Sequence, residues 1–316
     1  MFKEVAIEPA YLSSWDRIRL IVGQCGFEHG RLISDFPKGK WHWKVFESCH
    51  ECLPAEKKRI EEYLKSAKSK LIRRGRTFNE ANDWMHNAKR EHARHPFHAV
   101  ITKAPLPDAP DFVEGAELHE GHVKWRVGGD EVVPRTTQAM GAVAQELLAQ
   151  AKEIVLVDPN FEPKASYTKP LCRFVELATQ GSQLTRLEYH IEHDSTKEHF
   201  AEKLNTVVRR FLKLPPSLAL RFIRWKSLEQ PSRDAMHPRY LLTDLGGLRY
   251  DYGLCEGNDG ETTDVQFVPR GGAIYEQRWA DCLPVSNRFE FVDGFEVSSQ
   301  GVSELCIRDG RFQLIG

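Results

Sequence analysis

Apolar and polar positions divide the chain into two parts with different patterns. From about residue 131 onward, short apolar runs of strand length alternate with segments in which apolar residues recur at helical spacing. The clearest run is Glu-Ile-Val-Leu-Val-Asp-Pro at 153–159, a continuous apolar stretch closed by Asp-Pro, which is typical of a buried central strand. Strands interleaved with helices predict a layered α/β domain.

Further elements of this second part follow from the same periodicities. The expected strands are 187–191, 218–225, 239–243, 248–254 and 264–268, and the expected helices are 137–151, 171–179, 197–212 and 272–281. The tail from Arg288 is predicted to be β-rich. Asp293-Gly294 and Asp309-Gly310 each carry a dipeptide that favours a hairpin turn, so a hairpin is expected at both.

The first part has a mainly helical (α+β) pattern. Helices are expected after a cap at Ser13 or Ser14, at 54–74 and at 78–94, with strands at 2–12, 97–101 and 120–127. A chain of 316 residues is long for a single domain. We therefore predict a mostly helical domain over 1–130 and an α/β domain with a β-rich tail over 131–316.

Composition adds broad limits. The chain is 41% hydrophobic and 28% charged, with a formal net charge of −1, as in ordinary globular proteins. It has no run of eighteen apolar residues, and its start lacks the features of a signal peptide, so a cytoplasmic protein that does not bind membranes is expected. Seven cysteines, an odd number, do not suggest a disulfide framework.

Positive charge is concentrated between residues 56 and 76, where nine lysines and arginines face three glutamates. A basic helix in a neutral protein can follow a phosphate backbone. Lys57, Lys58, Arg73 and Arg74 are therefore predicted to bind nucleic acid, DNA ahead of RNA. A solvated helix face is the alternative interpretation.

The strongest chemical signal is the octet His237-Pro-Arg-Tyr-Leu-Leu-Thr-Asp244. Side chains at i and i+2 of a strand share a face, so His237 and Arg239 are expected to point the same way. Asp244, at the end of the strand, is expected to turn back and orient the imidazole. An imidazole beside a guanidinium forms a phosphate site that contains a nucleophile.

This octet resembles the His-x-Lys-x4-Asp signature of the phospholipase D superfamily, with Arg239 in place of lysine. A strand ending in Asp158-Pro159, about eighty residues earlier, extends the resemblance over about residues 132–282. The resemblance implies an α/β/α domain and a phosphodiesterase, most plausibly a nuclease, that needs no metal or cofactor. One histidine attacks phosphorus and a second protonates the leaving oxygen. The chain holds one half-site, which predicts a homodimer that pairs two copies of His237.

Some residues depart from the family pattern. Pro238 removes a strand hydrogen bond, and the Gly-Ser-x-Asn segment of the family is replaced by residues 245–258, where Asp251 and Asn258 are the candidate polar partners. These departures support a second interpretation, an inactive phospholipase D-like subunit that binds nucleic acid or serves as a scaffold. A single half-site fused to an unfamiliar domain also resembles components of bacterial phage defence, which suggests a partner protein in a defence complex.

Two other histidines begin a similar pattern without the acid at the required spacing. Cys49 occupies that position after His42, and the acid after His122 comes one residue late. A partner copy is therefore the preferred source of the second histidine.

The remaining polar groups have plainer interpretations. Cys49-His-Glu-Cys52 has a spacing that suits zinc, but no second pair follows it, so reduced cysteines are preferred and no metal is expected. Glu188, His190 and Glu192 alternate onto one face of an expected strand. They are interpreted as surface residues, with polar groups of the cleft as the alternative.

Overall fold

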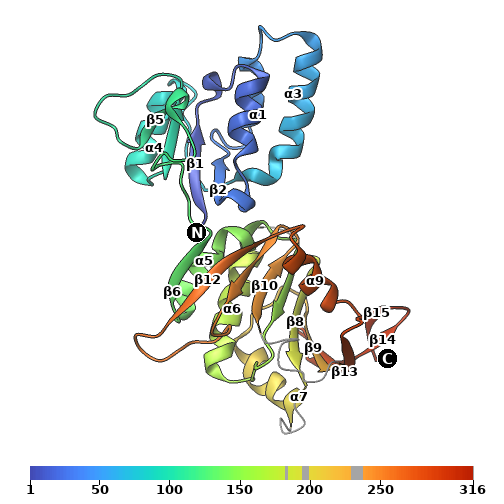
Figure 1. Cartoon of the computed structure of the whole chain (residues 1–316). Helices are drawn as coiled ribbons and strands as arrows, with labels where there is room; N and C mark the ends of the chain where they lie inside the picture. Colours follow the sequence, from blue (N-terminus) through green and yellow to red (C-terminus); the bar gives the residue numbers. More distant parts are fainter. Residues whose placement is uncertain (182–183, 194–198, 229–237, 316) are drawn as a thin grey trace. The chain divides into compact units, whose positions relative to one another are not determined.

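The computed structural model describes residues 1–181, 184–193, 199–228 and 238–315 (Figure 1). Contacts divide the chain into two compact units, Met1–Gly129 and Asp130–Gly316, one residue from the boundary that the sequence predicts. Within the described residues, no helix is long and apolar enough to cross a membrane.

The first unit is built around a parallel sheet in the order β3-β2-β1-β4-β5. Its strands are β1 (Lys3–Ile7), β2 (Arg31–Ser34), β3 (Leu71–Ile72), β4 (Ala99–Thr102) and β5 (Phe112–Glu114). Its helices are α1 (Trp15–Gly23), α2 (Trp41–Ser48), α3 (Pro54–Ser66) and α4 (Trp84–Arg94), with short 3-10 turns at Pro9–Tyr11, Phe27–His29, Ala67–Lys70 and Gly115–Glu117. The expectation of a mostly helical domain missed this central sheet.

Helices cover both faces of the parallel sheet, as buried parallel strands require. Val5 and Ile7 of β1 pack with the apolar faces of α1, α2 and α3, whereas Ala6 between them packs with Ala88 of α4. Ser14 caps α1, as predicted, by accepting a hydrogen bond from the backbone of Arg17.

Two local predictions for this unit are wrong. The expected helix at 54–74 ends at Ser66, because Leu71 and Ile72 form β3 and pair with β2. The expected strand at 120–127 consists of turns. There Trp125 is buried and donates a hydrogen bond from its indole to Gln24, while Val123 is 76% exposed, so the apolar residues of this segment do not form a sheet face.

The second unit contains a mixed sheet in the order β15-β14-β13-β9-β8-β7-β10-β11-β12-β6. Its strands are β6 (Asp130–Pro134), β7 (Glu153–Val157), β8 (Arg186–Glu192), β9 (Leu220–Ser227), β10 (Arg239–Thr243), β11 (Gly246–Tyr250), β12 (Thr262–Pro269), β13 (Phe289–Val297), β14 (Val302–Arg308) and β15 (Arg311–Leu314). β7, β8 and β9 are parallel, and the other neighbouring pairs are antiparallel. The predicted α/β class is therefore confirmed.

Helices lie on both faces of this sheet (Figure 1). They are α5 (Thr137–Gln150), α6 (Ala165–Thr179), α7 (Phe200–Lys203), a π-helical turn (Leu204–Val208), α8 (Arg209–Phe211) and α9 (Ala273–Asp281). On one face, Tyr250 of β11 donates a hydrogen bond to a carbonyl of α5 and its ring lies near Phe174 of α6. On the other face, Tyr275 of α9 packs with Val155 and Val157. β7 is buried on both sides, as its apolar run predicts.

The two Asp-Gly dipeptides of the tail have different outcomes. Asp309-Gly310 forms the predicted hairpin between β14 and β15, with φ values of 50° and 67° that suit this turn. The turn expected at Asp293-Gly294 is wrong, because both residues lie inside β13. Asp293 forms an ion pair with Arg224 of the neighbouring β9, so its carboxylate links two strands of the sheet.

Candidate functional site

Arg239 and Asp158 lie beside each other where β7 ends and β10 begins. Tyr240 pairs with Val157 and Leu241 with Leu156, so the register places Arg239 next to Asp158 on the same face of the sheet. Arg239 Nε lies 3.9 Å from Asp158 Oδ1, and the two side chains are 15% and 1% exposed. The geometry thus holds a guanidinium over a buried carboxylate.

Backbone groups hold the carboxylate of Asp158. Its Oδ1 accepts a hydrogen bond from the Asn160 amide (3.0 Å) and its Oδ2 accepts one from the Leu254 amide (2.8 Å). Gly253 allows this close approach, because it has a φ of 100° and a Cβ there would lie 3.3 Å from Asp158 Oδ2. The loop between β11 and β12 therefore packs against the end of β7.

Further polar side chains continue this cluster. Arg135 Nη2 donates to Cys255 Sγ at 3.1 Å, and its Nη1 forms an ion pair with Glu261 at 2.8 Å. Burial raises the pKa of Tyr167, and the charges of Asp158 and Cys255 raise it further. Its hydroxyl therefore stays protonated at neutral pH.

Asp244 lies at the opposite end of β10 from Arg239, so the prediction that it turns back is wrong. Its Oδ1 accepts hydrogen bonds from the amides of Lys152 (2.8 Å) and Glu153 (3.2 Å), where β7 starts. Asp244 is five positions after Arg239 along an extended strand, a distance of about 16 Å at ~3.3 Å per residue. The acid of the octet thus stabilises the start of β7.

His237, the predicted nucleophile, lies outside the described residues. Neither of the other two histidines that begin a similar pattern lies on a strand. His42 lies in α2 and His122 precedes a turn. The i, i+2 alternation of a strand, on which the half-site pattern depends, therefore does not apply to them.

The two predicted polar partners, Asp251 and Asn258, lie in the loop after β11. The carbonyl of Asp251, not its carboxylate, accepts a hydrogen bond from Arg239 Nη1 at 3.4 Å. The Asp251 carboxylate forms an ion pair with Arg249 at 3.3 Å. Asn258 donates from Nδ2 to Glu261 at 2.9 Å. The structure thus brings Asp251 to Arg239 through its backbone, while Asn258 is exposed and bonded to Glu261.

The predicted basic surface is divided between different elements. Lys57 and the exposed Lys58 lie on α3, whereas Arg73 and Arg74 follow β3 and are not helical. Lys57 Nζ donates to the carbonyl of His50 at 2.7 Å. Arg73 forms an ion pair with the buried Asp35 at 2.9 Å, and Arg74 lies 3.6 Å from the buried Glu4. These arginines compensate buried acids, which weakens the case for a continuous phosphate track.

Glu188 and His190 are buried, which corrects their interpretation as surface residues. His190 Nδ1 accepts from the indole of Trp225 (2.8 Å), so Nε2 carries the proton and donates to Glu188 (3.1 Å). Burial lowers the pKa of His190. Burial opposes the ionisation of Glu188, but hydrogen bonds from His190 and Arg186 outweigh it and lower its pKa to about 2.

The buried network of Glu188 and His190 and the side chain of Arg239 lie on opposite faces of the sheet. His190 follows the alternation of Val155 and Val157, which face α9, whereas Arg239 and Asp158 lie on the face of α5 and α6. Polar alternation along a strand is the pattern of a solvent-facing strand, so the sequence alone does not indicate that these two residues are buried. The large aromatic residue that partners His190, Trp225, comes from the next strand.

The two cysteines of the first unit that have zinc-like spacing, Cys49 and Cys52, are free thiols. Cys49 Sγ lies within hydrogen-bond distance of two backbone carbonyls, those of Leu12 and Val45, and burial raises its pKa to about 12. Across the described residues, no three histidine, cysteine, aspartate or glutamate side chains are grouped closely enough to hold a metal ion.

Comparisons of this chain with protein-family models, with curated proteins and with solved structures find no match.

Proposed function

We propose that the second unit is a phospholipase D-like domain that cleaves phosphodiester bonds of nucleic acid, DNA ahead of RNA, without a metal ion. The observation that carries the proposal is the placement of Arg239, held by Asp158 and the Asp251 carbonyl at the end of β7. The sequence puts His237 two residues earlier. A central strand ending in Asp-Pro, flanked by the parallel β8 and the antiparallel β10 and covered by helices on both faces of the sheet, supports the proposed α/β/α layering.

In the proposed reaction, Arg239 binds the non-bridging oxygens of the phosphodiester and offsets the charge that develops on them. His237 attacks phosphorus, a phosphohistidine forms, and the bond to the leaving oxygen breaks. A second His237, from a partner copy, gives its proton to that oxygen. Water then gives a proton to the second His237 and attacks phosphorus, which breaks the bond to the first His237 and returns both histidines to their starting forms.

Asp158, and not Asp244, is the acid that we propose acts beside Arg239. Its carboxylate is fixed by two backbone amides and lies beside Arg239, whereas Asp244 lies at the far end of β10. A fixed negative charge under a guanidinium limits where the guanidinium can move, so Asp158 is expected to aim Arg239 at the phosphate.

The test is cleavage of labelled DNA and RNA by the full chain in EDTA. His237→Ala is expected to abolish cleavage, and Arg239→Ala to reduce it about 10²–10³-fold, as when one preorganised donor to the transition state is removed. Arg239→Lys restores the signature residue and is expected to retain most of the activity. Lys226→Ala is the matched control, because Lys226 is an exposed cation of β9, a strand that does not pair with β10.

Two results reject this proposal. One is the absence of cleavage by the wild-type chain, and the other is cleavage by His237→Ala at the wild-type rate. The shared site also requires activity to depend on protein concentration, because monomers hold one half-site each. A chain that is monomeric by light scattering and still cleaves DNA rejects the homodimer.

A second candidate function is an inactive subunit that binds nucleic acid or serves as a scaffold, for example in a phage-defence complex with a partner protein. Two observations favour it. Asp244 lies far from Arg239. The charge of Arg239 is already balanced by Asp158. This function predicts that His237→Ala binds DNA as tightly as the wild-type chain and that neither protein cleaves it.

A further inference from the structure

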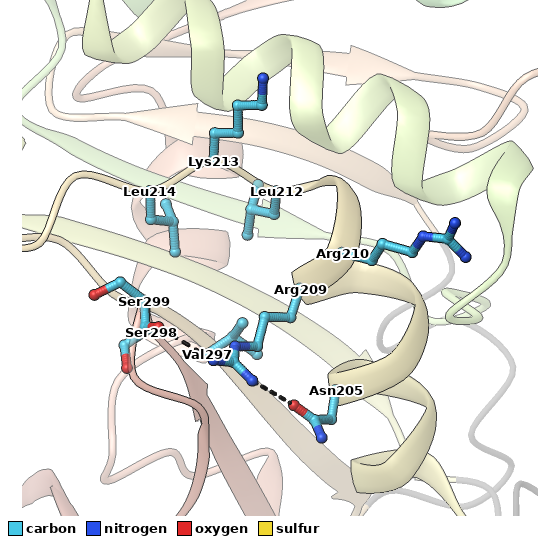
Figure 2. Close-up of a pocket in the computed structure, with 9 residues that line it drawn as sticks. All are labelled: Asn205, Arg209, Arg210, Leu212, Lys213, Leu214, Val297, Ser298 and Ser299. Atoms are coloured by element: carbon cyan, nitrogen blue, oxygen red, sulfur yellow. Dashed lines mark hydrogen bonds between the residues drawn. The ribbon is translucent and has the colours of Figure 1, made fainter.

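A cavity of about 520 Å³ lies in the second unit beside the π-helical turn, α8 and the turn that joins β13 to β14 (Figure 2). Three cationic residues of one short segment, Arg209, Arg210 and Lys213, line it together with the polar residues Ser298 and Ser299. None of the described residues that line the cavity is acidic. The local charge is therefore positive and attracts anions.

Arg209 is the cation that faces the cavity. Its Nη1 donates to Asn205 Oδ1 at 3.2 Å and its Nη2 donates to the carbonyl of Ser299 at 3.2 Å. Figure 2 shows Arg209 directed towards Asn205 and the Ser298–Ser299 turn, whereas Arg210 and Lys213 extend away from it. These two bonds link the helical segment to the turn and fix the plane of the guanidinium before any ligand arrives.

The guanidinium keeps capacity for a ligand after these contacts. It has five N–H donors in a rigid fork. Among the described residues, two of these donors form hydrogen bonds, one to Asn205 and one to Ser299. Charge and fork together match an oxyanion such as a phosphate group. The rare π-helical turn directly before Arg209 is a feature that recurs at functional sites.

The cavity is suited to more than an inorganic ion. Its volume falls within the range of about 300–1,000 Å³ that is usual for small-molecule sites. Leu214 also lines it and is partly exposed, so it offers apolar surface to an uncharged part of a ligand, whereas the other two apolar lining residues, Leu212 and Val297, are buried. A phosphate on Arg209 and an organic group against Leu214 correspond to the two parts of a nucleotide.

This cavity is separate from the site at Arg239. Val297 pairs with Leu220, the first residue of β9, whereas Asp158 follows the last residue of β7. Because β7, β8 and β9 are parallel, these positions lie at opposite edges of the sheet. Binding of a ligand in the cavity is therefore independent of the proposed cleavage activity.

We propose that this cavity binds a nucleoside monophosphate, with Arg209 on its phosphate and Leu214 against its nucleoside. The same unit occurs as a free nucleotide and as a residue of single-stranded nucleic acid. The shared chemistry is a phosphate ester with an organic group, and the two sources differ in whether the phosphate is joined to a second sugar.

The test is isothermal titration of the full chain with adenosine monophosphate, adenosine and inorganic phosphate at about 1 mM, where weak binding is measurable. The monophosphate is expected to bind more tightly than either of its parts. Arg209→Ala is expected to weaken it by about tenfold to a hundredfold, which is the range for a charge-assisted hydrogen bond. Lys203→Ala, an exposed cation earlier in the same helical segment, is the matched control and is expected to bind normally.

Arg209→Lys keeps the charge and loses the fork, so it is expected to bind with intermediate affinity, and it covers the case that Arg209→Ala does not fold. Single-stranded oligonucleotides that bind more tightly than the monophosphate, in an Arg209-dependent way, identify nucleic acid as the source. Binding of the monophosphate alone identifies the free nucleotide. The proposal is overturned if the monophosphate does not bind, if phosphate alone binds as tightly, or if Arg239→Ala removes binding while Arg209→Ala does not.

Discussion

Removing the carboxylate of Asp244 separates its two possible roles, structural support and chemistry. In Asp244→Ala the amides of Lys152 and Glu153 lose the oxygen that accepts their hydrogen bonds. A hydrogen bond to a charged group contributes roughly 1.5–3 kcal/mol when buried and less where water replaces it. Both amides lie near the surface, so we expect the free energy of unfolding to fall by about 2 kcal/mol in total.

Asp244→Asn keeps one acceptor oxygen and loses the charge, so about half of this loss is expected. Urea unfolding measures both values from a shift of the midpoint at unchanged m. Hydrogen exchange gives a local readout, because the amides of Lys152 and Glu153 are expected to lose protection while those of β10 keep theirs. Exchange of Lys152 and Glu153 at the wild-type rate contradicts the structural role.

The same variants are expected to bind and cleave nucleic acid as the wild-type chain does, at temperatures well below unfolding. The reason is the distance of about 16 Å between Asp244 and Arg239 along an extended strand. If Asp244→Ala loses binding or cleavage while its stability and hydrogen exchange stay normal, Asp244 acts at Arg239 and our account of the site is wrong. DNA binding serves as the readout if the wild-type chain does not cleave.

Two further predictions concern the neighbouring structure. Gly253→Ala is expected to destabilise the unit by about 1–3 kcal/mol, because the residue has a positive φ and its Cβ would press on Asp158; Gly260→Ala, also at positive φ but in open space, is the control and should lose less in urea unfolding. The pKa of Glu188 is lowered from 4.5 to about 2, so its contribution to stability is complete above pH 4.5 and is lost as the pH falls towards about 2. The loss is at most about 3 kcal/mol. Urea midpoints measured across this window should fall for the wild-type chain and stay flatter for Glu188→Gln, and equal slopes contradict the buried pair with His190.

Local sequence signals identified many elements of the second unit. The run at 153–159 reads as a buried strand because its central residues are all apolar, and β7 is that strand. Identical dipeptides nevertheless adopt different structures: Asp309-Gly310 forms a turn, whereas Asp293-Gly294 lies within β13. An Asp-Gly dipeptide favours a turn only through local interactions. Asp293 remains in a strand because it forms an ion pair with Arg224 of the neighbouring strand.

By itself, the sequence determined the strand of Arg239 and the strand ending at Asp158, because residue type and a period of two need no tertiary information. Only the tertiary structure decided which acid accompanies Arg239. The antiparallel register of β10 against β7 brings Asp158 to one end of β10 and the start of β7 to the other, where Asp244 binds its amides. Spacing along a chain does not specify that pairing, since it depends on which residue of a distant strand lies opposite.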